Sequence, residues 1–232
     1  MPKYLWKFLK SDLKSAHGSL KWKVGEWKKI EGQVTLCENG FHASKKILDA
    51  LSYVRGEVLA YVEVKGKHKS EEDKQAWSEM RIEKAYHWTN EDSISLAIYA
   101  AELCLANFEK TRPDDKRPRD AIEAAKAYLK NPCEKTRIAA SAAWSAASAA
   151  SEVSAAWSAA SAARSAADAA WSAASAAGAA RSAASAAWSA VGAAIKGTNT
   201  KIENWLQNHV KKLKPYKRRT TNENMSRRLL RN

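Results

Sequence analysis

The chain has 232 residues and a mass of 25.6 kDa, which is long enough to bury a hydrophobic core without disulfide bonds. Its three cysteines, Cys37, Cys104 and Cys133, have no short paired spacing. This excludes a disulfide-rich fold and favours a cytoplasmic protein. We expect neither a membrane span nor a secretion signal, because no apolar run reaches the required length.

Positive charge is concentrated at the C-terminus. The formal net charge is +14, and over the last 22 residues nine basic residues face a single acid, Glu223. Such a tail attracts polyanions by counterion release, so we expect it to bind nucleic acid or an acidic host protein. The nine residues are Lys211, Lys212, Lys214, Lys217, Arg218, Arg219, Arg227, Arg228 and Arg231.

Residues 1–88 are expected to form an α+β module. The strongest strand signal lies between two glycines, where every second residue from Val58 to Val64 is apolar. Apolar residues at helical spacing after Ser44 predict a short helix with that serine as its N-cap. The expected strands are 3–10, 34–37, 56–66 and 81–88, and the expected helix is 44–54.

Residues 89–135 are expected to form a helical connector. Thr89 and Asp92 have the spacing of a capping box, so a helix should continue through Ile94 to Phe108. The charged stretch 110–118 contains two prolines and predicts a loop. A second helix is expected over 119–130.

Residues 136–197 form a low-complexity Ala/Ser/Trp repeat, with 31 alanines between residues 139 and 194. Alanine favours helix, and the Ala pairs recur about every 3.4 residues, close to the period of a left-handed supercoil. A long helix or a helical hairpin is therefore expected. Its seam of small residues needs a partner helix, from the same chain or from a second copy, so a homo-oligomer is expected. The tryptophans expected to mediate assembly are Trp144, Trp157, Trp171 and Trp188.

Two further segments complete the chain. Apolar residues from Ile202 to Leu213 recur at spacings of three and four, which predicts an amphipathic helix over 198–214 after a short linker. Residues 215–232 are the basic tail. The chain is thus expected to have an α+β N-terminal module, a mainly helical Ala-rich region and a basic tail.

Motifs for catalysis or metal binding are weak. The glycines form no phosphate-binding loop, and Cys37 and His42 lack a second close pair of ligands, so no metal site is expected. The most distinctive stretch is 36–44, where Asn39 and Gly40 predict a sharp turn before His42. A core histidine beside a turn and a ligand-binding histidine both fit this pattern.

Two resemblances involve this stretch. The motifs Trp-Lys-Val-Gly-Glu-Trp (22–27) and Cys-Glu-Asn-Gly-Phe-His-Ala-Ser (37–44), with a Val-rich strand and the repeat, look like a group of bacteriophage and bacterial proteins of unknown function. That resemblance implies such an origin and no activity. Residues 39–44 and 59–64 are also similar to the glycine-aromatic-aromatic-alanine segment and following strand of ADP-ribosyltransferase-like folds.

The second resemblance implies NAD as a cofactor and His17-Gly18 as the counterpart of that family's first-strand histidine-glycine. His42 replaces the usual aromatic residue, and no glutamate is clearly placed as the catalytic one. The residues to test for catalysis are His17, His42, Glu79 and Glu83.

Three functions are compatible with these patterns. The leading hypothesis is a non-enzymatic, phage-type accessory protein without a cofactor, which packs or oligomerises through its Ala-rich helices and binds an anionic partner through its basic C-terminus. One alternative is an NAD-dependent ADP-ribosyltransferase-like enzyme. The other is a virion structural component, which would form large ordered assemblies.

Overall fold

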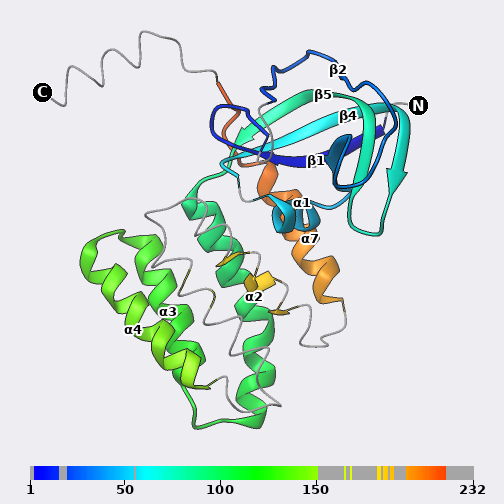
Figure 1. Ribbon diagram of the computed structural model, residues 1–232. Helices are drawn as coiled ribbons and strands as arrows, with labels where there is room; N and C mark the ends of the chain where they lie inside the picture. The colour runs from blue at the N-terminus through cyan, green and yellow to red at the C-terminus, as the bar shows by residue number, and fades with distance from the viewer. Residues whose placement is uncertain are drawn as a thin grey trace, which may run out of the picture.

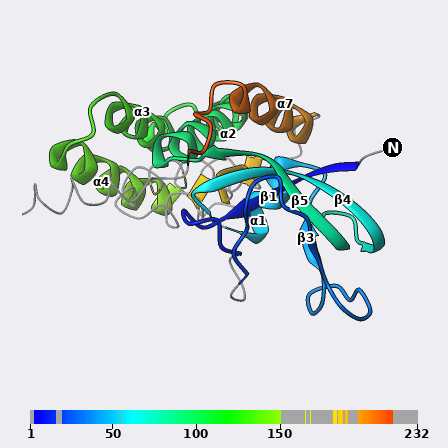
Figure 2. The same ribbon diagram turned by 90° about the horizontal axis from the view of Figure 1, so that it is seen from above.

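The computed structural model describes residues 3–15, 20–54, 56–150 and 197–217, together with nine helical residues between 165 and 190. For residues 143–150 it describes the backbone alone. A curled antiparallel sheet occupies one end of the molecule, and the helices lie to one side of it (Figures 1 and 2). The described part of the chain is therefore a mixed α+β structure.

The sheet has five strands, in the order β1-β4-β5-β2, with β3 also paired to β5. The residue after β3 closes part of the curl, because Ser44 and Trp6 exchange backbone hydrogen bonds of 2.8 and 2.9 Å across to β1. The strands are β1 (Lys3–Leu9), β2 (Lys28–Lys29), β3 (Phe41–Ala43), β4 (Val58–Ser70) and β5 (Gln75–His87).

Both faces of the sheet are buried near its centre. Leu5 and Leu9 of β1 pack with alternate residues of β4 in an inner cluster, inside the curl. Trp6 and Phe8, on the opposite face of β1, face the helices together with Leu59. The alternation predicted between Val58 and Val64 is confirmed, since those side chains share the inner cluster.

Two strand predictions are corrected by the structure. Residues 34–37 form a turn, because Thr35 and Asn39 bond to each other at 2.7 and 3.0 Å and Cys37 takes a positive φ of 67°. The hairpin of β4 and β5 is also longer than expected. Gly66 lies at an irregularity between Lys65 and His68, and β4 continues beyond it to Ser70.

Five helices have described bounds: α1 (Ile47–Tyr53), α2 (Asn90–Thr111), α3 (Arg117–Lys130), α4 (Glu134–Ala150) and α7 (Thr198–Val210). The capping box of α2 is confirmed, with Asp92 N donating to Thr89 Oγ1 at 3.3 Å and Thr89 N to Asp92 Oδ2 at 2.7 Å. Helix α3 begins within the expected loop, because Pro118 is tolerated in a first helical turn.

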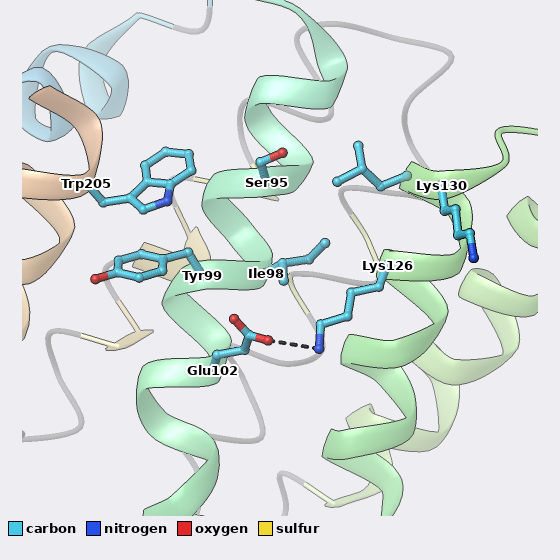
Figure 3. Close-up of a pocket in the computed structure, with 8 residues that line it drawn as sticks. Ser95, Ile98, Tyr99, Glu102, Lys126, Lys130 and Trp205 are labelled. Atoms are coloured by element: carbon cyan, nitrogen blue, oxygen red, sulfur yellow. Dashed lines mark ion pairs between the residues drawn. The ribbon is translucent and has the colours of Figure 1, made fainter. Parts of the chain in front are cut away.

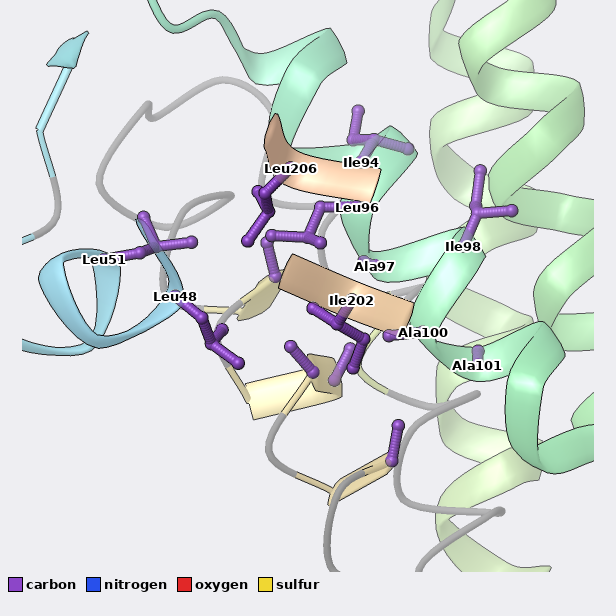
Figure 4. Close-up of a cluster of buried hydrophobic side chains, with 14 of the residues drawn as sticks. Leu48, Leu51, Ile94, Leu96, Ala97, Ile98, Ala100, Ala101, Ile202 and Leu206 are labelled. Atoms are coloured by element: carbon purple, nitrogen blue, oxygen red, sulfur yellow. The ribbon is translucent and has the colours of Figure 1, made fainter. Parts of the chain in front are cut away.

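Three helices meet in one hydrophobic cluster beside the sheet. Leu48 and Leu51 of α1, several residues of α2, and Ile202 and Leu206 of α7 point toward one another (Figure 4). Four alanines of the repeat are fully buried in the same cluster: Ala183, Ala186, Ala187 and Ala190. This part of the repeat therefore packs within its own chain, and its other residues past Ala150 lie mostly outside the described ones.

The capping box offers a first stability test. We expect Thr89→Ala to lower the free energy of unfolding by about 1 kcal/mol, because the first turn of α2 loses the acceptor for one backbone N–H. Urea unfolding at neutral pH measures this. Thr111→Ala, at the exposed end of the same helix, is the matched control. Equal effects of the two changes would contradict the capping role.

Candidate anion-binding surface

The chain that follows α7 joins the edge of the sheet. His87 N donates to Lys214 O at 3.0 Å, Tyr216 N donates to Ala85 O at 2.8 Å, and Tyr86 and Pro215 form an antiparallel bridge. The two backbone bonds of this pairing are donated by His87 and Tyr216. Pro215, which has no N–H, therefore lies at a position where no donor is needed. The first part of the predicted basic C-terminus is therefore fixed on β5.

Helix α7 directs the chain to that edge. Its Glu203 carboxylate accepts hydrogen bonds from Ile47 N at 3.1 Å and Leu48 N at 3.4 Å, so it caps the start of α1. Near its other end, His209 Nε2 lies 2.6 Å from Asp92 Oδ1 of α2. These two polar contacts and the buried apolar face of α7 fix the position from which residues 211–217 continue toward β5.

A loop from the N-terminal half lies beside the same edge. Leu13 and Trp22 are buried in the inner cluster, and the residues flanking them pair through a bridge between Lys14 and Lys21. The hydroxyl of Tyr216 donates to Ser11 O at 2.8 Å, which joins the C-terminal segment to this loop. In Figure 1 both segments lie at the same end of the sheet.

Together these segments form a surface that we call the basic edge. All nine of its lysines are exposed: Lys10, Lys14, Lys21, Lys23, Lys84, Lys211, Lys212, Lys214 and Lys217. Lys14 forms an ion pair of 2.9 Å with Asp12. Within the described ranges, no carboxylate is paired with any of the other eight.

Backbone pairing brings like charges together on the basic edge. Lys14 and Lys21 are direct partners in an antiparallel bridge. Continuing the register of Tyr86 and Pro215 places Lys217 beside Lys84. Like charges directly opposite one another are destabilising, so a bound anion would relieve a repulsion that the fold itself creates.

His42 has a different environment from the basic edge. Its Nε2 accepts a hydrogen bond from Cys37 N at 2.9 Å, and its backbone oxygen accepts one from Lys7 Nζ at 2.8 Å. Burial, followed by the nearby Lys7 charge, lowers the pKa of His42. In this geometry His42 is a half-buried histidine that holds the turn at Cys37.

The other residues proposed for catalysis are not joined to His42 by any contact within the described residues. Glu79 forms an ion pair of 3.5 Å with Lys65, and Glu83 forms one with Arg81. Both lie on β5 beyond Ala76, which is the residue paired with His42. His17 falls outside the described residues, so the catalytic alternative stays a prediction.

Several predicted site residues also fall outside the described part of the chain. For Trp144 only the backbone is described, as part of α4, and the other three assembly tryptophans are outside it: Trp157, Trp171 and Trp188. The same holds for the last five residues of the predicted anion-binding set: Arg218, Arg219, Arg227, Arg228 and Arg231. Among the described residues, no cluster of His, Cys, Asp or Glu has the arrangement of a metal site.

Sequence reasoning missed five lysines of the basic edge, Lys10, Lys14, Lys21, Lys23 and Lys84, because in the sequence they lie in a module with a small net charge. The signal available was the run of lysines around Trp22. That run indicates a binding surface only in combination with the C-terminal segment, which the tertiary structure places beside it.

A separate pocket of about 390 Å³ lies between α2, α3 and α7. Tyr99 and Trp205 stack at one side of it, with ring centroids 5.6 Å apart, and Glu102 points across to Lys126 at 2.9 Å (Figure 3). The internal ion pair neutralises Lys126, so this pocket has less positive character than the basic edge.

Comparison with known proteins finds a similarity for the N-terminal module. No curated protein and no solved structure matches the chain. None of the helices in the described ranges is long and apolar enough to cross a membrane. Residues 3–92 match the model of a domain of unknown function, DUF7666, and this stretch is therefore similar to that family's domain.

Proposed function

We propose that the protein is a non-enzymatic accessory protein that binds an anionic partner through the basic edge. The observation that carries this proposal is the pairing of residues 214–216 with β5. It holds Lys214 and its neighbours on the edge of β5, and the bond from the Tyr216 hydroxyl to Ser11 O joins this segment to the lysine-rich N-terminal loop. The first residues of the basic tail, 215–217, thus belong to a surface of defined geometry.

The physical basis of binding is electrostatic. Exposed lysines without carboxylate partners attract polyanions, and each contact releases counterions into solution. Binding should therefore weaken steeply as salt concentration rises. The Ala-rich helices serve packing in this proposal, supported by the burial of Ala183 and Ala187 against α1, α2 and α7.

Retention on immobilised heparin, measured as the salt concentration needed for elution, tests this proposal. We expect the triple variant Lys23→Ala/Lys84→Ala/Lys214→Ala to elute at clearly lower salt than the wild-type protein, because three unpaired charges of the basic edge are removed. Circular dichroism confirms that the variant is folded.

The matched control is Lys67→Ala/Lys69→Ala/Lys135→Ala, which removes the same net charge from exposed positions on the distal β4 arm and at the start of α4. It should elute close to the wild-type protein. If both triple variants elute together, net charge alone explains retention and the basic edge is not the site.

A further inference from the structure

We infer that the partner of the basic edge is duplex nucleic acid, held by its phosphate backbone without readout of the bases. This inference rests on the proposed function, because it names the class of polyanion that the same nine lysines would bind. Three features of the surface separate duplex nucleic acid from a single strand and from an acidic protein.

The first feature is the absence, within the described part of the basic edge, of an aromatic ring free to stack on a base. Trp22 is 3% exposed, and its indole nitrogen donates to Ser15 Oγ at 2.9 Å. Tyr216 uses its hydroxyl on Ser11 O, and its ring lies 4.9 Å from that of His87. Single-strand binding draws much of its affinity from stacked bases, which this surface would not engage.

The second feature is the scarcity of apolar anchors. Interfaces with proteins depend on a dry core of apolar and aromatic side chains that fill pockets on the partner. In the segments that form the basic edge, Leu13 and Trp22 are buried in the fold, and Val24 is the large aliphatic residue that is prominently exposed, at 44%. A surface of point charges with one exposed valine fits phosphates better than an acidic protein.

The third feature is the type and placement of the charges. All nine basic side chains of the described edge are lysines, which bind phosphate as point charges and impose no planar, bidentate geometry. Paired like charges, such as Lys14 opposite Lys21, match a ligand with a high and continuous density of negative charge. A duplex has a higher density than a single strand, and each contact with it releases more counterions.

Fluorescence anisotropy with the full chain tests the inference. The probes are a short labelled DNA duplex, one of its strands alone, and polyglutamate carrying the same number of charges, each titrated at several salt concentrations. We expect the duplex to bind most tightly, with the same affinity after its base sequence is shuffled. The triple variant Lys23→Ala/Lys84→Ala/Lys214→Ala should lower the slope of log affinity against log salt by about three.

The outcomes separate the inference from the proposed function. Polyglutamate bound as tightly as the duplex would overturn nucleic acid as the partner while leaving anion binding intact. A single strand bound more tightly than the duplex, or an affinity that changes on shuffling, would overturn backbone binding of a duplex. Failure of all three probes to bind at low salt would overturn both proposals.

Discussion

Leu206→Ala is expected to destabilise the entire protein by about 2–5 kcal/mol, although Leu206 lies far beyond the N-terminal module in the sequence. Leu206 is fully buried and packs in the cluster shared by α1, α2 and the sheet (Figure 4). Truncation would leave a cavity where three elements meet, since neither α1 nor α2 can close on it without moving the other.

Urea unfolding, followed by circular dichroism and by tryptophan fluorescence, measures this effect. Asn204→Ala, an exposed position two residues earlier on the same helix, should change stability by less than about 0.5 kcal/mol. If Leu206→Ala proves as mild as Asn204→Ala, α7 would be a peripheral attachment and would not set the position of the basic edge.

Lys7→Met, in contrast to Leu206→Ala, is expected to raise the free energy of unfolding at pH 7. Lys7 lies between Leu5 and Leu9 on the inner face of β1, and burial lowers the pKa of its amine to about 8. A shift of that size corresponds to roughly 3 kcal/mol for a fully buried group. Two effects reduce this value: Lys7 is partly exposed, and the variant loses the hydrogen bond to His42 O. We therefore expect Lys7→Met to raise the free energy of unfolding by about 1–2 kcal/mol.

The pH dependence of this gain identifies its cause. The unfolded chain keeps a normal lysine pKa of 10.5, whereas the folded chain releases the proton near pH 8. Between these values the unfolded state binds more protons, so the stability of the wild-type protein rises with pH and the penalty fades. The advantage of Lys7→Met should therefore be full below pH 8 and should shrink toward pH 10.

Unfolding curves of both proteins at pH 7, 8, 9 and 10 measure the difference directly. Lys45→Met, at an exposed residue before α1, is the control and should leave the free energy of unfolding close to that of the wild-type protein. A difference between Lys7→Met and wild type that stays constant across this range would show that packing of the methionine, and not burial of a charge, is responsible.

Much of the local structure could be predicted from the sequence. Alternating apolar residues marked the inner face of β4, the spacing of Thr89 and Asp92 marked the start of α2, and the apolar positions from Ile202 marked α7. Each of these signals depends on the geometry of one element and its end. The turn at Cys37 was missed because the short segment 34–37 has the residue types of a strand, and the backbone bonds between Thr35 and Asn39 that decide its structure leave no mark in those residue types.

The candidate site could be predicted only in part. The concentration of charge after residue 210 was evident, and it indicated an anionic partner. The sequence did not show which other lysines lie beside that segment, because Lys14, Lys84 and Lys214 belong to three distant parts of the chain. His42 shows the same limit, since its hydrogen bond from Cys37 N and the nearby Lys7 depend on how β1 and β3 meet.

The sequence by itself thus determined which faces of β4 and α7 are apolar, where α2 begins and where positive charge accumulates. These properties depend on residue type and on spacing within a few residues along the chain. Only the tertiary structure decided that residues 214–216 pair with β5 and that α7 caps α1 through Glu203. Such contacts depend on the register between elements far apart in sequence, where many pairings are locally equivalent and the burial of the whole core selects one of them.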